Sequence, residues 1–257
     1  GKAPVEIMNQ LGYCAMAVGN HEFDYGIDQL KVLAELADFP FLSLNFQTAA
    51  DGKDVFRPYT IVECAGVKIA FLGVSTPETL TNARPTYFMD GSGNFLYTFL
   101  GDSEGTALWQ AVQQNVDAAR SEGADYVIAL SHLGVNSASS PYMSTEMIAA
   151  TSGIDCVLDG HSHTVIESES VTDKAGKKVL LSSTGTGLVN LGCLKITKDG
   201  KLSAALVSGY EPKEEAAAAF IAQLQAENET LLAKEIGTTA NALVIKDPGT
   251  GARLIRN

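Results

Sequence analysis

All four histidines of this 257-residue chain lie just after short apolar segments, in three polar motifs. The motifs are GNHEFD at residues 19–24, SHLG at 131–134 and GHSH at 160–163. Short apolar runs that end in glycine or serine are typical of buried strands. Because ligand sites of α/β sheets lie beyond the carboxyl ends of strands, we expect these motifs to meet at one edge of one sheet. Imidazole, amide and carboxylate groups gathered there would suit a transition-metal ion.

Predicted strands and helices alternate in the first half of the chain, and predicted hairpins follow. Apolar residues at helical spacing predict helices over 27–37, 106–121 and 214–234, and Pro141 suits the first turn of a helix over 141–150. This order favours an α/β fold in which two packed mixed β-sheets are flanked by helices. The segment 76–102 is rich in Gly, Asn, Thr and Pro and predicts a long irregular loop.

The composition allows a sizeable core and restricts the partners. Hydrophobic residues make up 46% of the chain, and the formal net charge is −12. Binding to nucleic-acid polymers depends on Lys and Arg, so the acidic balance argues against such partners but not against a small phosphorylated substrate. No apolar run reaches the roughly 18 residues of a membrane helix. Cys14 and Cys156 fall in predicted buried strands, where a free thiol behaves as a small hydrophobe.

Three residues at the predicted strand ends are candidates for binding a metal ion. His161 and His163 are two residues apart on a predicted turn, which allows both rings to face one cavity. A lone histidine is more often structural than a ligand, but His132 in a similar position favours the metal site.

The GNHEFD motif adds groups of other kinds. Asn20 offers a neutral carbonyl oxygen, which is a suitable ligand beside imidazoles. His21 is followed three residues later by Asp24, whose carboxylate can orient the ring and favour its protonated form. Such a histidine suits proton donation to a leaving group. The alternative for Asp24 is a cap on the helix predicted from Ile27.

The sequence GNHEFDYG at 19–26 resembles the signature of the 5′-nucleotidase branch of the calcineurin-like metallophosphoesterases. SHLG and GHSH are similar to later motifs of that family and occur in the same order. The segments NQLGY at 9–13 and GVSTPE at 73–78 also look similar, and the resemblance covers about residues 1–234. It implies an αββα sandwich and a site with two divalent metal ions, which are Zn, Mn, Mg or Fe.

The resemblance also implies roles for individual residues. Asn20, His132 and His161 would bind one metal ion, and His163 would bind the other. His21, held by Asp24, would stabilise the transition state or protonate the leaving oxygen. Three further residues are interpreted as structural: Glu22 and Phe23 in the first motif, and Asp159, which we expect to support the turn.

Two upstream motifs of the family, an Asp-x-His and a Gly-Asp that supplies the bridging carboxylate, are not found in this sequence. We therefore expect a partial catalytic domain over 1–212 whose N-terminal strands are missing. A linker helix over 213–236 and the start of a truncated substrate-binding domain over 237–257 would follow. Without the bridging anion two dications repel each other, so we expect weak metal binding and poor hydrolysis from this chain.

The expected parent protein is a metal-dependent phosphoester hydrolase that acts on nucleotides. The motifs do not separate a 5′-nucleotidase from a 2′,3′-cyclic-nucleotide phosphodiesterase or a nucleotide-sugar hydrolase. The resemblance implies an extracellular, periplasmic or cell-surface location. One alternative is a non-catalytic binding module that retains the fold. Another is a mononuclear zinc protein unrelated to phosphoesters, but the His-Glu-x-x-His motif that would support it is absent.

Overall fold

The computed structural model describes residues 1–238 of the chain. The chain divides into two compact units, Gly1–Pro212 and Lys213–Asn257. The described part of the second unit contains one helix, α6 (Glu215–Leu232). The expected start of a substrate-binding domain over 237–257 lies, from residue 239 onwards, outside the described residues. No helix in residues 1–238 is both long enough and apolar enough to cross a membrane.

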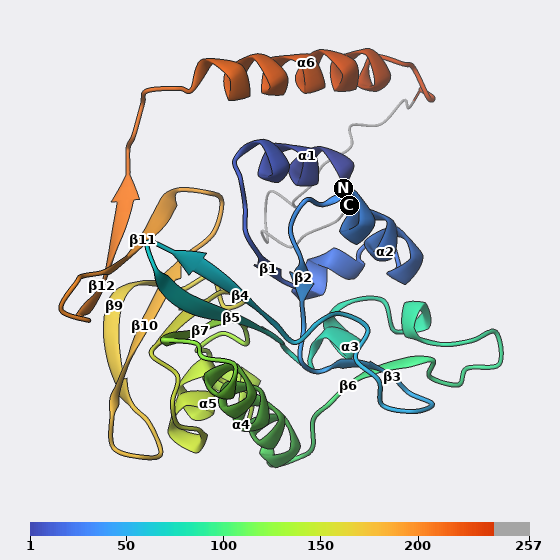
Figure 1. Cartoon of the computed structure of the whole chain (residues 1–257). Coiled ribbons are helices and arrows are strands. Elements are labelled where there is room, and N and C mark those ends of the chain that lie inside the picture. Colours follow the sequence, from blue (N-terminus) through green and yellow to red (C-terminus); the bar gives the residue numbers. More distant parts are fainter. Residues whose placement is uncertain (239–257) are drawn as a thin grey trace, which may run out of the picture. The chain divides into compact units, whose positions relative to one another are not determined.

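A six-stranded mixed sheet forms the centre of the first unit (Figure 1). Its strand order is β4-β5-β7-β8-β10-β9; the middle four strands are parallel, and the edge strands β4 and β9 are antiparallel to their neighbours. The bounds of these strands are β4 (Tyr59–Cys64), β5 (Val67–Ser75), β7 (Tyr126–His132), β8 (Cys156–Asp159), β10 (Lys178–Thr184) and β9 (Val165–Thr172).

Helices cover one face of this sheet. Alternate residues of the parallel strands, such as Leu72, Val127 and Ala129, are fully buried in one apolar cluster with Leu108 and Val112 of α4. The helices on this face are α4 (Thr106–Ser121) and α5 (Ser144–Ala150). The apolar residues at every second position of the strands thus pack against the apolar face of α4 in one core.

Short strands lie over the opposite face. Strand β1 (Met16–Ala17) pairs in parallel with β2 (Phe41–Leu42), and a Cβ atom on Gly73 of β5 would collide with the backbone of Leu42. Glycine at position 73 therefore lets the two layers approach closely. Outside these strands lie α1 (Lys2–Gln10) and α2 (Ile27–Leu36), which contribute to a second apolar cluster around Phe23 (Figure 1).

A hairpin covers another part of the same face. Strands β11 (Asn190–Ile196) and β12 (Leu202–Ser208) pair antiparallel. Ile69 and Phe71 of β5 and Leu194 of β11 line one cavity of about 540 Å³ between the layers. The remaining elements are β3 (Phe46–Thr48), β6 (Tyr97–Phe99), α3 (Thr79–Asn82), η1 (Asn20–Phe23), η2 (Pro85–Phe88) and η3 (Ser137–Ser139).

The expected α/β architecture of mixed sheets flanked by helices is confirmed, but several local predictions were wrong. The segment 76–102 is not one irregular loop, because it contains α3, η2 and β6. Helix α5 begins at Ser144 rather than at Pro141. Cys156 is buried as expected, whereas Cys14 is exposed because β1 starts only at residue 16. All four cysteines are free.

Candidate functional site

The carboxyl ends of β5, β7 and β8 lie level with one another. Ser75 pairs with His132 across β5 and β7, and Ser131 pairs with Asp159 across β7 and β8. His132 is therefore the last residue of its strand, and the turn at 160–163 leaves the sheet at the same edge. Parallel register alone brings two of the three histidine motifs together.

The third motif joins them through a buried polar contact between β1 and β5. The hydroxyl of Ser75 donates a hydrogen bond to the carbonyl oxygen of Val18 at 2.6 Å, and its oxygen lies 2.8 Å from Ser43 Oγ. The amide nitrogen of the Asn45 side chain donates to the Ser75 carbonyl at 2.8 Å. These bonds fix the chain just before Gly19, so η1 starts at the edge where β7 ends.

Asn20, His132 and His161 form one cluster of side chains. Asn20 Oδ1 lies 2.9 Å from His132 Nε2 and 3.2 Å from His161 Nδ1, and the two imidazole centroids are 5.0 Å apart. Asn20 is 8% exposed. Three potential ligand atoms, from η1, the end of β7 and the turn after β8, thus lie close together.

The backbone around the cluster is shaped to admit these rings. A Cβ atom on Gly19 would lie 2.7 Å from the His132 ring, and one on Gly160 would lie 3.3 Å from His132 Nδ1. His161 and His163 both have left-handed backbone, with φ of 68° and 56°. Non-glycine residues adopt this region at a cost of order 1 kcal/mol, and such residues cluster at functional sites.

Burial favours the neutral form of His132. Burial, followed by the charges of His161, His21 and His163, lowers the pKa of His132 from 6.5 to about 4. The other three histidines therefore lie close enough to disfavour a positive charge on His132. A neutral imidazole retains the lone pair that a metal ion requires.

His21 and Asp24 form the expected pair beside the cluster. His21 Nδ1 lies 3.0 Å from Asp24 Oδ2, and both side chains are more than half exposed. The alternative, in which Asp24 caps the following helix, is wrong, because the N-cap of α2 is Gly26 and receives no side-chain hydrogen bond. His163 is exposed on the turn after β8.

Other acidic residues of the motifs hold the loops in place. Asp159 Oδ1 accepts hydrogen bonds from the Gly134 amide at 3.2 Å and from the Ser144 hydroxyl at 2.7 Å, and burial raises the pKa of this carboxyl. Glu22 Oε2 accepts from the Gly19 amide at 2.7 Å, and burial raises its pKa as well. Phe23 is completely buried. All three residues have the structural surroundings expected of them.

Sequence reasoning missed one residue at the cluster. Glu78 Oε2 lies 3.0 Å from His161 Nε2, on the side of the ring opposite Asn20. Glu78 follows β5 in the GVSTPE segment, whose similarity to the family implied no role for its glutamate. A single glutamate in a Thr-Pro-Glu turn carries no local signal for a histidine 83 residues away.

The donor set fits one divalent cation. One amide oxygen and two imidazole nitrogens are a sound ligand set for Zn²⁺ or Mn²⁺, and the glycines at 19 and 160 leave room for the rings. Within residues 1–238, no group of three or more His, Cys, Asp or Glu side chains is arranged to hold a metal ion. In this described part of the chain, the cluster reaches three donors only through Asn20, and no carboxylate joins it in the bridging position.

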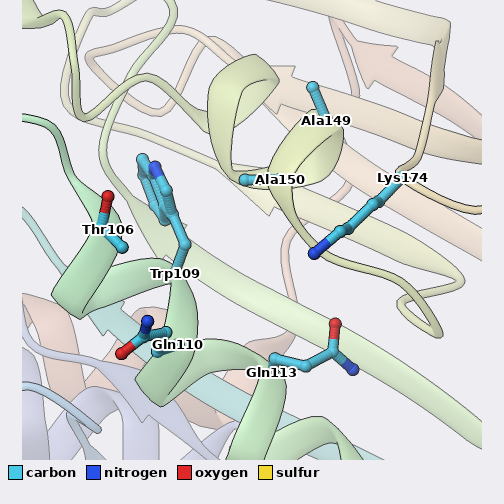
Figure 2. A pocket seen from close by; sticks show the side chains of 7 residues that line it. All are labelled: Thr106, Trp109, Gln110, Gln113, Ala149, Ala150 and Lys174. Carbon is cyan, nitrogen blue, oxygen red and sulfur yellow. The ribbon is translucent and has the colours of Figure 1, made fainter.

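A further cavity lies away from this cluster. A cavity of about 400 Å³ is enclosed by α4, α5 and the turn between β9 and β10, as Figure 2 shows. Its lining residues are Thr106, Trp109, Gln110, Gln113, Ala149, Ala150 and Lys174. None of them is a predicted ligand or catalytic residue, so this cavity is not the candidate site.

Two solved structures share the fold of this chain. The 5′-nucleotidase precursor from Thermus thermophilus matches 91% of this chain over 47% of its own, with a TM-score of 0.71 and 24% identity. The calcineurin-like phosphoesterase YfkN from Bacillus subtilis matches 90% of this chain over 75% of its own, with a TM-score of 0.72 and 22% identity. The fold is therefore that of the calcineurin-like metallophosphoesterases.

Sequence comparisons define the family. Residues 2–186 match the profile described as bacterial capsule synthesis protein PGA_cap, and the chain belongs to this family. Protein UshA of Yersinia enterocolitica is 35% identical over 127 residues, and a 5′-nucleotidase of Vibrio cholerae is 36% identical over 127 residues. Each alignment covers 49% of this chain and 21% of the relative. The resemblance to the 5′-nucleotidase branch is thus confirmed, although the matched part is about a fifth of each relative.

Proposed function

We propose that this chain carries part of the active site of a divalent-metal-dependent hydrolase of nucleotide phosphoesters. The observation that supports this most directly is the contact of Asn20 Oδ1 with His132 Nε2 and His161 Nδ1. A paired histidine and aspartate lie beside that cluster. Together these features would supply a cation site and a proton donor.

In the proposed site the cation would be held by Asn20, His132 and His161, and His163 would contribute to a second position. A cation bound there would polarise a phosphoryl oxygen as a Lewis acid. As water attacks the phosphorus atom and the bond to the leaving oxygen breaks, His21 donates a proton from its Nε2 atom to that departing oxygen. Asp24 accepts the hydrogen of Nδ1, which leaves Nε2 free to face the substrate. The exposure of His21 gives a substrate access to this ring.

The proposed substrates are nucleotides or other small phosphorylated molecules. Relatives of this chain bear the names 5′-nucleotidase and 2′,3′-cyclic-nucleotide 2′-phosphodiesterase/3′-nucleotidase. The net charge of −12 disfavours the binding of long polyanions. A small phosphate group would therefore be recognised by the bound cation and the histidines. An extracellular, periplasmic or cell-surface location is part of this proposal and rests on the family resemblance.

This chain by itself is expected to bind metal weakly and to hydrolyse phosphoesters slowly. Three neutral donors hold one cation, but without a bridging carboxylate a second dication is repelled. We expect calorimetric titration with Mn²⁺ or Zn²⁺ to show one weak site. We also expect slow turnover of a chromogenic phosphodiester. Two tight sites with rapid turnover would contradict the expected impairment, and no metal binding at all would contradict the proposed function.

A second candidate function is a non-catalytic binding module. It is favoured by the finding that, among residues 1–238, no three His, Cys, Asp or Glu side chains are grouped to hold a metal ion. The two candidates differ in what His21 does. If the chain is catalytic, His21→Ala removes the residual turnover and leaves metal affinity unchanged. If the chain is a binding module, metal-dependent nucleotide binding persists without turnover, and His21→Ala changes neither.

A further inference from the structure

The surroundings of Glu78 differ from those of most acidic side chains of this chain. Glu78 lies between the end of β5 and α3, where its backbone amide donates to Thr76 Oγ1 at 3.3 Å. Its side chain is only 27% exposed. Burying a carboxylate costs free energy unless hydrogen-bond or ionic partners offset the lost hydration, so the contacts of Glu78 indicate which groups stabilise it.

Two side chains meet at a single oxygen of Glu78. The hydroxyl of Ser139 donates to Oε2 at 3.1 Å, and His161 Nε2 lies 3.0 Å from the same atom. The side chain of His161 is 14% exposed, so water competes little for this contact. Ser139 is itself 6% exposed in the packed loop after β7. Glu78 is therefore held from one side by Ser139 and holds His161 on the other.

The contact decides which nitrogen of His161 carries hydrogen. A carboxylate only accepts hydrogen bonds, so the nitrogen that faces Glu78 must be the N–H. The other nitrogen, Nδ1, faces the neutral oxygen of Asn20 at 3.2 Å. A carboxylate is the stronger acceptor of the two. In the neutral ring the hydrogen thus sits on Nε2, and Nδ1 presents its lone pair to the position shared with Asn20 and His132.

We propose that Glu78 is a positioning residue that fixes the Nε2–H tautomer of His161 and aims its Nδ1 atom at the bound cation. The proposal rests on the proposed function, because it assigns His161 to a metal site. Carboxylates that accept from the second nitrogen of a metal-binding histidine orient the ring and increase its strength as a ligand. The left-handed backbone of His161 sets the position from which its side chain leaves the main chain. The contact with Glu78 sets the orientation of the imidazole ring.

The first test measures the tautomer without any metal. Long-range ¹H–¹⁵N correlation spectra at pH 8 distinguish the protonated from the unprotonated ring nitrogen, and four histidines give a resolvable spectrum. We expect His161 of the wild-type chain to be Nε2–H. Glu78→Ala should shift it towards Nδ1–H, which then donates to Asn20. Glu78→Gln should retain Nε2–H, because the amide oxygen still accepts.

The second test measures Mn²⁺ affinity by calorimetry. Loss of such a partner typically costs 10- to 100-fold in metal affinity, and we expect Glu78→Ala to fall in this range. Glu78→Gln should lose less than Glu78→Ala. Glu122→Ala is the matched control, because it removes a glutamate that accepts a side-chain hydrogen bond from the Tyr59 hydroxyl at 2.7 Å. This variant should bind Mn²⁺ like the wild type.

Each result has one consequence. An Nδ1–H tautomer in the wild type, or unchanged tautomer and affinity in Glu78→Ala, would overturn the positioning role. If the wild-type chain binds no Mn²⁺, the proposed function fails, and the tautomer alone decides whether Glu78 positions the ring. If Glu78→Ala does not fold, Ser139→Ala replaces it, since it removes the hydroxyl that anchors Glu78 Oε2 and should weaken the same tautomer preference.

Discussion

Substituting alanine for Gly19 would test the geometry of the cluster with a single added carbon. The backbone of Gly19 is extended, with φ −101° and ψ −175°, so alanine adopts it without strain. The new Cβ atom would lie 2.7 Å from the His132 ring, and ordinary contact begins at 3.4 Å. The ring must therefore move by about 0.7 Å, which is enough to break its 2.9 Å contact with Asn20.

The expected cost is that of overpacking a well-packed site, about 1–3 kcal/mol in the free energy of unfolding. Urea denaturation followed by circular dichroism would measure it, and the urea dependence of that free energy should stay unchanged. Because a metal site tolerates displacements of only about 0.5 Å, we also expect Mn²⁺ affinity to fall at least tenfold.

Gly91→Ala is the matched control. Gly91 is exposed, its φ lies outside the left-handed region, and a Cβ atom there meets nothing within 4 Å. This variant should match the wild type in stability and in metal affinity. The argument would be refuted if Gly19→Ala were within about 0.5 kcal/mol of the wild type and bound Mn²⁺ equally well.

Three further predictions concern the protonation of His132, the layer packing at Gly73 and the role of Asp24. The pKa of His132 lies near 4 in the folded chain and at 6.5 otherwise, so the unfolded chain takes up the proton first. In metal-free chain, roughly 3 kcal/mol of stability present above pH about 6.5 should be lost as pH falls towards 4, and His132→Leu should remove this dependence in urea titrations across pH. Gly73→Ala should destabilise the chain by more than Gly19→Ala, because its Cβ would meet the rigid backbone of Leu42; an equal midpoint in urea would contradict the layer packing. Asp24→Asn should lower residual phosphodiester turnover at least tenfold with unchanged Mn²⁺ affinity, and a matching loss of affinity would show that Asp24 acts on the cluster instead.

The strand ends and their histidines were predictable because the relevant patterns are local. Apolar runs that stop at glycine or serine mark buried parallel strands, and the order of such strands brings their ends to one edge. Glycine at positions 19 and 160 was part of the recognisable motifs. Its reason, the room needed by the His132 ring, became visible only with the structure.

The missed features depend on contacts that no local pattern records. Strand β9 reads VIESESVT and is largely exposed at the sheet edge, so its apolar content is too low to predict a strand. Glu78 acts on a histidine 83 residues away, and its neighbours in sequence do not indicate that. The strand predicted from the apolar run at residues 14–18 was too long, because only two of its residues pair in β1.

Asn20 is separated from His132 by 112 positions and from His161 by 141. An unfolded polymer cannot keep three such distant donors together, because closing loops of this length costs entropy that only a completed topology compensates. A bound ion would consequently stabilise the native state relative to the unfolded chain. The melting temperature of the protein should therefore rise as the free ion concentration exceeds the dissociation constant. Thermal shift against Mn²⁺ concentration would then report assembly of the whole sheet edge and not merely occupancy of a surface.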